Sequence, residues 1–563
     1  MPPFAAFTVL DWLILAAYLA GIALLGVWIG RRVGRTEQYF LGARRFNRWV
    51  MIAQSFASGT HADMPVSLAG AVYARGFSAI WFQWKNMFAT PFYWLLAPLY
   101  RRMRRTTIAE FFEDRYGARM GAAYMVFALA FLTINMASML KGAAKVISQA
   151  AGGDIPVNAI VVAMTAAFLL YSFIGGQVAT AWTELVQGFL IIVLSFLLIP
   201  LGWGLVGGMA GIRDALGPER LTLTAPEGIG PWFILMLTIN GLIGITSQPH
   251  IMGMVATGRD EAACREGFLY GTFVKRFCTL GWALTGLVAA ALLAKGVFGT
   301  TTLKDAEEAF GFACRHLLFP GGKGLLVACL LAANMAACSA YMVSAGALFT
   351  RNLYGRYLVR HGSDRHYLRV GRLSGLLITL LGVLYALFLI EKVLNTFLLT
   401  ETLATYVGIA VLGGIFWRRA NRWGALAGIT AAMAANFGIY SWLGQRFDHW
   451  DPNVFLAALL VGTAAFVVVS LLTPAEPDAA LDDFFRRLRT PSHLNPEQAA
   501  TIEDVEREAA RRGEQLLLTH LLHPLRGAAG EPFWRAYRID LQGFAAGWVI
   551  ALGMVALAWL IIR

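Results

Sequence analysis

Residues 55–70 read Ser-Phe-Ala-Ser-Gly-Thr-His-Ala-Asp-Met-Pro-Val-Ser-Leu-Ala-Gly and lie in the middle of an apolar run long enough to cross a bilayer. An ionised Asp63 at that depth costs about 2.5–3.5 kcal/mol on insertion scales, so its carboxylate must face protein or water. Pro65 removes a backbone donor, and glycines on both sides loosen the helix. A broken, polar helix at membrane depth predicts a solute site. The alternative is a kinked helix in which His61 and Asp63 satisfy each other.

The composition places most of the chain inside a membrane. Hydrophobic residues make up 58% of the 563 residues, charged residues only 14%, and the mean hydropathy is +0.59. Apolar runs of about 20 residues, the length that crosses hydrocarbon as a helix, recur along the sequence. The five cysteines show no CxxC or metal-ligand spacing, so we infer no disulfide framework. We expect no cleavable signal peptide before the first span. The composition excludes a soluble enzyme and predicts an all-α integral membrane protein.

The apolar runs predict about fourteen transmembrane helices. Their expected positions are residues 9–30, 48–72, 80–100, 120–149, 157–175, 181–206, 231–255, 270–298, 323–350, 370–390, 394–416, 423–444, 452–473 and 544–562.

The loops between these spans alternate in charge. Every second loop carries arginines, and the loops between are nearly free of such clusters, which by the positive-inside rule places the N-terminus outside. The net charge of +13 therefore reports topology and not a nucleic-acid partner. The clusters on the predicted inner side are Arg31, Arg32, Arg35, Arg44 and Arg45; Arg101, Arg102, Arg104 and Arg105; Arg351, Arg356, Arg360, Arg365 and Arg369; and Arg418, Arg419 and Arg422.

This pattern divides the chain into five parts. Residues 1–47 hold the first helix and an inner loop, 48–416 a helical core, 417–473 two further helices, 474–543 a cytoplasmic segment and 544–563 the C-terminal helix. The cytoplasmic segment is punctuated by prolines and contains an amphipathic stretch rich in Glu and Arg. We interpret it as a tether that covers the inner surface. A regulatory role is the alternative.

A second apolar span is interrupted in the same manner as the first. Residues 240–250 read Asn-Gly-Leu-Ile-Gly-Ile-Thr-Ser-Gln-Pro-His, so that Gln248, Pro249 and His250 stand in an apolar run. Two interrupted spans in corresponding positions of two halves are the sequence trace of an inverted repeat, with the binding site where the breaks meet. We therefore predict a five-plus-five inverted-repeat bundle within residues 48–416.

Five short motifs occur in order along the chain. They are Tyr39-Phe-Leu-Gly42 with Arg44, Thr107-Ile-Ala-Glu-Phe111 with Arg115-Tyr-Gly117, Gly175-Gly176 with Trp182-Thr-Glu-Leu-Val-Gln187, Ser247-Gln-Pro-His250, and Leu348-Phe-Thr-Arg-Asn-Leu-Tyr354. Together they resemble the sodium:solute symporter family, the group that contains sodium/proline, sodium/glucose and sodium/sialic-acid carriers. The resemblance runs through most of the chain. It implies the LeuT-type inverted-repeat fold, with transport by alternating access.

The resemblance also implies a sodium site between the broken second span and the ninth span. The backbone carbonyls of that site fall on Ala57, Thr60 and Ala333. Its two hydroxyl-bearing positions fall on Ala336 and Ala337, whose methyl groups donate no oxygen to a hard cation.

Two accounts of ion coupling are therefore open. In one, sodium binds at a displaced position that uses Ser339, the Asp63 carboxylate or Glu184, which stands where the family has an aspartate. In the other, the sodium site is lost, and His61, Asp63 or Lys85 couples transport to protons or to nothing. A lysine ammonium is physically able to take the place of a bound cation.

Polar residues of the third span complete the predicted solute site. Lys85 stands near the middle of that span, between Gln83 and Asn86, and we expect it to pair with Asp63 or to contact a solute carboxylate. Snorkelling toward an interface is the alternative. Gln83, Asn86 and, at the second break, Gln248 supply hydrogen bonds suited to a small polar solute.

These features predict a secondary active transporter. We find no P-loop, nucleophile elbow or HExxH, and we expect no enzymatic activity. We expect a multi-pass protein of the plasma membrane that imports a small polar organic solute, with carboxylate-bearing solutes favoured. The alternatives are a proton-coupled or uncoupled carrier of sugars or polyols, and a symporter-like membrane sensor. Besides the solute, the lipid and a coupling sodium ion if its site is retained, we expect no organic cofactor, nucleic acid or obligate protein partner.

Overall fold

The computed structural model describes residues 7–30, 44–151, 155–225, 228–390, 392–446, 450–494, 502–520 and 532–563. Every named element within these ranges is a helix, and the β-type pairing found there is one isolated bridge between Phe46 and Gly258. This agrees with the all-α class predicted from the composition. The first of the five motifs, Tyr39 to Gly42, lies outside the described residues.

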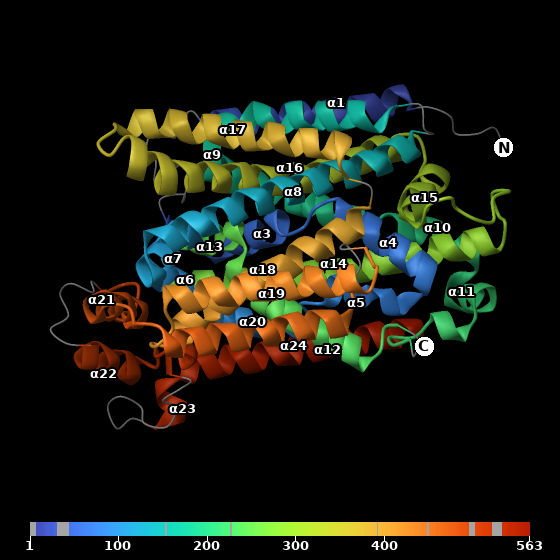
Figure 1. Ribbon diagram of the computed structural model, residues 1–563. Coiled ribbons are helices and arrows are strands. Elements are labelled where there is room, and N and C mark those ends of the chain that lie inside the picture. The colour runs from blue at the N-terminus through green and yellow to red at the C-terminus, as the bar shows by residue number, and fades with distance from the viewer. Residues whose placement is uncertain are drawn as a thin grey trace.

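The long helices lie side by side and run between the same two ends of the molecule (Figure 1). One end carries short helices, among them α7 (Ile108–Tyr116), α21 (Asp478–Arg489), α22 (Ile502–Arg512) and α23 (Phe533–Ala536). We call it the arginine-rich end. The opposite end carries α11 (Gly208–Leu216) and α15 (Ala309–Leu317).

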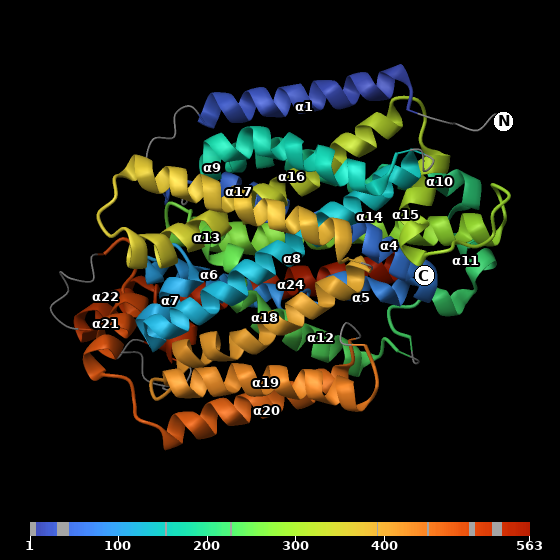
Figure 2. The same ribbon diagram turned by 45° about the horizontal axis from the view of Figure 1, so that its top comes forward.

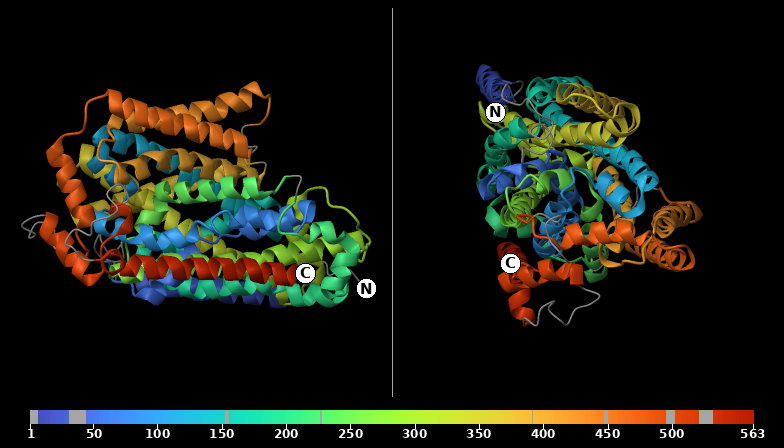
Figure 3. Two further views of the ribbon diagram at one scale, coloured as in Figure 1. Left: turned by 90° about the horizontal axis from the view of Figure 1, so that it is seen from below. Right: turned by 90° about the vertical axis from the view of Figure 1, so that its left-hand side faces the viewer.

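Two further helices mark the edges of the bundle. Helix α1 (Val9–Gly30) lies at one edge, and α20 (Pro452–Leu472) lies at the opposite edge (Figure 2). The last helix, α24 (Arg538–Ile562), runs along the outside of the bundle, away from the arginine-rich end (Figure 3).

Each predicted span falls on helical residues, but several spans are not single helices. Nine helices of the described ranges are long and apolar enough to cross a membrane alone, or ten with one bent pair. The expected number of about fourteen is therefore not fixed by this criterion, which leaves out spans made of short pieces. The two spans predicted at residues 157–175 and 181–206 are not separated in the structure, because α9 (Val157–Phe196) runs through both and is followed by α10 (Leu198–Val206). Besides α1, α20 and α24, the other spans correspond to α3 (Arg48–Ser58) with α4 (Asp63–Arg75), α5 (Trp81–Trp84) with α6 (Thr90–Met103), α8 (Ala118–Ala150), α12 (Pro231–Gly244) with α13 (Pro249–Val255), α14 (Glu261–Ala294), α16 (Gly322–Leu348), α17 (Asp364–Phe388), α18 (Val393–Phe416) and α19 (Arg422–Trp442).

The first break separates α3 from α4. Helix α3 ends at Ser58 and α4 begins at Asp63, so the break is found at the start of the predicted stretch. Buried backbone groups need partners at membrane depth. The Thr60 hydroxyl donates to the carbonyl of Phe56 at 2.6 Å, and the Ala62 amide donates to the side chain of Asn334 on α16 at 3.0 Å. A neighbouring helix thus completes the backbone that the break leaves open.

The second break separates α12 from α13, and the chain bends there by 67°. Gln248 is extended, and Pro249 follows at the first helical position, where its missing amide hydrogen costs no helical bond. The Ser247 carbonyl accepts from Tyr124 at 2.6 Å, and the Ser247 hydroxyl donates to the carbonyl of Ala404 at 2.5 Å. Both interruptions predicted from the sequence are therefore present.

Helix α14 crosses both halves of the first broken span at very short range. A Cβ at Gly271 would lie 2.6 Å from the Ile52 carbonyl of α3, and one at Gly286 would lie 2.8 Å from the Ala69 carbonyl of α4. Any side chain larger than hydrogen would push α14 away at these two crossings. The face of α14 that carries these two glycines therefore lies along the break, and Lys275, four residues after Gly271, is on that face.

The polar segment after α20 packs onto the arginine-rich end. Phe484 and Phe485 of α21 are buried, and both rings lie about 6 Å from the guanidinium of Arg115. Arg102 at the end of α6 donates to both carboxylate oxygens of Glu261, each at 2.9 Å, and to the carbonyl of Glu514 at 2.8 Å. The segment therefore covers this end of the bundle, with α21 an additional helix that the sequence pattern did not separate.

Helix α24 is held to α14 by a buried ion pair, which gives a test of the fold. Arg265 and Asp540 lie 2.6 Å apart with side chains at most 3% exposed. Asp540→Ala leaves a buried guanidinium without its partner, which costs about 3–5 kcal/mol, so we expect a clearly lower Tm in detergent. Asp482→Ala is the control, because it breaks an exposed pair with Arg418 worth about 0–1 kcal/mol. Equal Tm values for the two variants would contradict the docking of α24.

Candidate functional site

A cavity of about 70 Å3 lies where the two broken spans meet. Gly59 and His61 line it from the first break, and Gln248 and His250 line it from the second. The other lining residues are Ser55, Met64, Gln83, Lys85, Asn86, Tyr93, Asn135, Ile245, Ile251, Met254, Phe268, Thr272, Lys275, Arg276, Tyr341, Phe397 and Glu401. Of the six residues predicted to bind solute, all but Asp63 therefore face one cavity.

The predicted pair of His61 and Asp63 forms within the first break. His61 Nδ1 contacts Asp63 Oδ1, and both side chains are buried. Asp63 is not among the lining residues. It packs so closely on Gly142 of α8 that a Cβ atom added at Gly142 would lie 2.6 Å from the Cβ atom of Asp63. His61 thus presents its ring to the cavity, while Asp63 holds that ring from behind.

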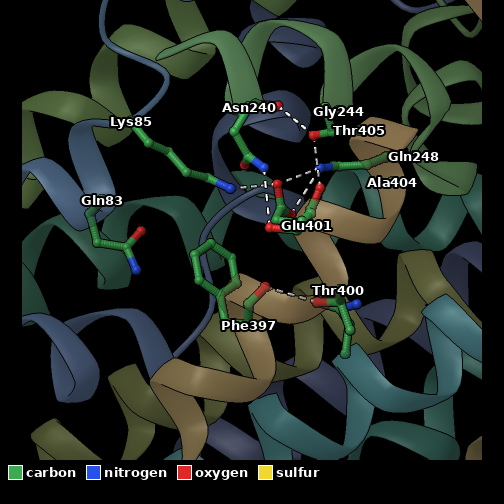
Figure 4. A network of polar contacts seen from close by, with 12 residues as sticks. Gln83, Lys85, Asn240, Gly244, Gln248, Phe397, Thr400, Glu401, Ala404 and Thr405 are labelled. Carbon is green, nitrogen blue, oxygen red and sulfur yellow. Dashed lines mark hydrogen bonds and ion pairs between the residues drawn. The ribbon is translucent and has the colours of Figure 1, made fainter. Parts of the chain in front are cut away.

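Lys85 is paired with Glu401 of α18, 316 residues away along the chain (Figure 4). The ammonium and the carboxylate are 2.6 Å apart, and neither side chain is more than 8% exposed. Gln248 donates to both oxygens of the same carboxylate at 2.9 Å, and Lys85 lies 4.7 Å from the ring centre of Phe397. The expected pairing of Lys85 with Asp63 is therefore wrong, because Asp63 is engaged by His61 and Glu401 supplies the counter-charge.

Two further cations reach the cavity from α14. The Lys275 ammonium donates to the carbonyl of Gly59 in the first break, and Arg276 donates to the carbonyl of Gln83 at 2.5 Å. Trp84 fixes this turn of α14 by donating its indole N–H to the Arg276 carbonyl at 3.0 Å. Within the described part of the chain, neither Lys275 nor Arg276 forms an ion pair with a carboxylate.

Several polar atoms on the cavity wall have no hydrogen-bond partner among the described residues. They include the side-chain oxygen of Asn86, the hydroxyl of Tyr93 and Nδ1 of His250. The His250 ring itself packs against Tyr341 with ring centres 4.6 Å apart and ring planes tilted by 33°. Buried polar atoms in native proteins are normally satisfied, so these atoms leave unused hydrogen-bonding capacity beside the cavity, with Oδ1 of Asn86 turned to Gly241 of α12.

The residues that the resemblance assigns to sodium lie beside the first break. Asn334 of α16 accepts from the Ala62 amide at the break, and Ala333, Ala336 and Ala337 are buried on the neighbouring positions of the same helix. The Ala57 carbonyl accepts from the Thr60 amide at 3.2 Å. The two alanine side chains bring methyl groups, and therefore no oxygen, to this region.

Two other predicted cation ligands, Ser339 and Glu184, differ in their hydrogen bonding. The Ser339 hydroxyl donates to the Met335 carbonyl at 2.5 Å. Glu184 of α9 is fully buried, and neither carboxylate oxygen has a hydrogen-bond partner among the described residues. Glu184 lies one turn from Gly188, which packs against Phe56 and Ala57 of α3. A carboxylate oxygen pair therefore lies near the break.

The sequence reasoning missed three charged residues of this cavity, namely Lys275, Arg276 and Glu401. We began the eighth span at residue 270, which left Lys275 close to its expected inner end, but α14 begins at Glu261 and carries Lys275 four turns into the bundle. Glu401 stands alone in the apolar run of α18. A charged residue inside an apolar span was the available signal in each case.

Residues 39–431 match the profile of the sodium:solute symporter family. The chain belongs to this family. The osmoregulated proline transporter of Bacillus subtilis is 28% identical over 82% of this chain and 94% of its own length. The sodium/proline symporter of Escherichia coli is 26% identical over 85% and 96%, and the sodium/glucose cotransporter of Vibrio parahaemolyticus is 22% identical over 75% and 84%.

A Na+-coupled sialic acid symporter, solved in a substrate-bound outward-open state, has a similar fold. The TM-score is 0.71 at 18% sequence identity, over 84% of this chain and 99% of that one. The predicted LeuT-type helical fold is thus confirmed, and the protein is a secondary transporter of the symporter family. Within that family, alanines at positions 336 and 337 are a departure from the hydroxyl-bearing pattern that the resemblance implies.

The pair of Lys85 and Glu401 gives a second test in this symporter. Lys85→Met leaves a buried carboxylate with Gln248 as its remaining partner, and loss of one half of a buried pair costs about 3–5 kcal/mol. The double variant Lys85→Met/Glu401→Gln removes both charges, so we expect it to regain most of the lost Tm. A double variant as unstable as Lys85→Met alone would show that the two side chains are not coupled.

Proposed function

We propose that this symporter carries a small organic solute with a carboxylate group, bound in the cavity between the two breaks. The proposal extends the family's general activity to a solute class. Its support is the charge balance of the cavity wall, taken together with the wall's unpartnered polar atoms.

The observation that carries the proposal is the pair of cations on α14. Glu401 is engaged by Lys85 and Gln248, and Asp63 is engaged by His61. Lys275 and Arg276 then stand at the cavity without a carboxylate partner among the described residues. Buried charges are stable when they are paired, and a solute carboxylate supplies the missing counter-charge.

Neutral sugars or polyols are the second candidate, and the amides of the wall favour them. Gln83, Asn86 and Asn135 all face the cavity and offer donors and acceptors without charge. The sodium/glucose cotransporter among the relatives transports a neutral solute. Against this candidate, a neutral solute would leave Lys275 and Arg276 uncompensated.

The orientation of the protein is part of the proposal. The arginine-rich end collects Arg102, Arg105, Arg115 and Arg418, each of which contacts α7 or α21. Under the positive-inside rule this end faces the cytoplasm of a plasma membrane. This puts the segment after α20 inside the cell and makes import the direction from the opposite end. Cysteine accessibility to a membrane-impermeant reagent, with single cysteines placed at exposed Lys304 and Asp482, tests the assignment.

Ligand-dependent thermal stabilisation of the purified full chain tests the solute class. The panel contains acetate, L-lactate, L-proline, D-glucose and glycerol, and uptake into proteoliposomes follows for each compound that raises Tm. We expect at least one carboxylate to raise Tm and to be taken up, with no effect of glucose or glycerol. Stabilisation and uptake of glucose or glycerol alone would replace the proposal by the neutral-solute candidate.

Arg276→Met separates the two candidates within the site. Removing the guanidinium takes away a charge-assisted bond worth about 1.5–3 kcal/mol, so we expect carboxylate affinity to fall roughly tenfold to a hundredfold. Arg259→Met is the matched control, because Arg259 is exposed and pairs with Asp260 at the surface. Unchanged carboxylate affinity in Arg276→Met would contradict a role of Arg276 in solute binding.

A further inference from the structure

We propose that the Lys275 ammonium is a tethered cation at the break between α3 and α4, and that it holds the solute carboxylate where a bound sodium ion would otherwise be needed. This inference rests on the proposed function, since it names the partner of the solute carboxylate. It assigns to Lys275 a specificity-determining role that the family resemblance does not supply.

The end of α3 is a place that favours positive charge. The last carbonyls of a helix lack intrahelical partners, and the helix dipole adds partial negative charge there. In this chain Gly59 is the C-cap of α3, and the Lys275 ammonium donates to its carbonyl. The crossings at Gly271 and Gly286 place the intervening part of α14 against the break, so the backbone geometry brings Lys275 to this position.

The carbonyls around the break are already engaged by donors of the protein. The Ala57 carbonyl accepts from two backbone amides, those of Gly59 and Thr60, and the Phe56 carbonyl accepts from the Thr60 hydroxyl. The Gln54 carbonyl accepts from the Ser58 hydroxyl at 2.5 Å. The Ala57 carbonyl thus uses both of its lone pairs, so a sodium ion would have to displace one of these bonds to be ligated there.

The facing helix α16 offers few side-chain oxygens to a sodium ion. Ala336 and Ala337 carry no side-chain oxygen, and the Ser339 hydroxyl is turned to the Met335 carbonyl. The α16 side of the break is therefore poor in side-chain oxygen, and the two oxygens of Glu184 on α9 are the unpartnered carboxylate oxygens described near the break. This is fewer oxygen ligands than a sodium shell of about six requires, whereas an ammonium that arrives on a side chain needs only three acceptors.

The ammonium of Lys275 still has capacity for a ligand. One N–H is used by Gly59, and Lys275 lines the cavity without an ion-pair partner among the described residues. The other cavity lysine, Lys85, is neutralised by Glu401. A carboxylate in the cavity would accept from Lys275 directly, with Arg276 of the same turn as a second donor, so solute binding would need no sodium.

The experiment measures Tm of the purified full chain in sodium, potassium and choline chloride, first without solute and then with L-lactate and L-proline as carboxylate probes. We expect no sodium-specific stabilisation of the wild-type protein, and the same apparent affinity for a stabilising probe in all three salts. Lys275→Met should weaken that affinity roughly tenfold or more, Lys275→Arg should keep most of it, and Lys304→Met, at an exposed site, should change nothing.

Three results would overturn the inference. They are stabilisation of the wild-type protein by sodium alone, binding of a carboxylate probe in sodium but not in potassium or choline, and unchanged probe affinity in Lys275→Met. If Lys275→Met does not fold, the salt comparison on the wild-type protein decides alone. If no carboxylate probe binds but glucose does, the proposed solute class is wrong, and with it the role of Lys275 as the partner of a solute carboxylate. The replacement of a sodium ion by Lys275 is then decided by sodium alone. A sodium-specific rise in Tm overturns it, and the absence of such a rise supports it.

Discussion

The break between α3 and α4 is the constraint on which the rest of this structure depends. It exposes backbone polar groups at a depth where water is absent, and each such group costs several kcal/mol unless it finds a partner. Asn334 of α16 completes one side of the break, and Lys275 of α14 completes the other. The glycines that let α14 cross so closely follow from the need to complete the backbone at this one interruption.

The charges of the interior follow from the same constraint. A cation drawn to the end of α3 needs a counter-charge, but the two carboxylates nearest the cavity are already engaged, Asp63 by His61 and Glu401 by Lys85. Lys85 and Glu401 neutralise each other and join α18 to the third span, so they fix the shape of the cavity and not its net charge. The uncompensated charge is left to Lys275 and Arg276, which belong to one turn of one helix. Selectivity in this cavity therefore rests on a single short piece of α14.

The sequence was sufficient to find the breaks but not their partners. Glycine, proline and a buried aspartate mark residues 59–65 and 240–250 by local chemistry, and that signal needs no knowledge of the fold. The partner of Lys85 lies 316 residues away, so choosing Glu401 over Asp63 required the packing of α18. Lys275 was lost for a different reason, since a span boundary placed nine residues too late makes an interior lysine resemble one at a membrane surface. Ala336 and Ala337 were informative only against a family pattern, because an alanine by itself signals nothing.

A tethered cation changes the charge that moves in each transport cycle. When a sodium ion enters with a carboxylate, the pair is neutral, and the membrane potential neither drives nor opposes its movement. An ammonium that stays on α14 neutralises the carboxylate in the cavity but does not accompany it across. Import of the bare anion would then be opposed by about 2.3 kcal/mol for each 100 mV of inside-negative potential. One proton carried with each carboxylate would restore neutrality. A cation can therefore bind the solute without driving its transport. Lys275 binds the solute carboxylate, and an ion that crosses the membrane has to supply the driving force.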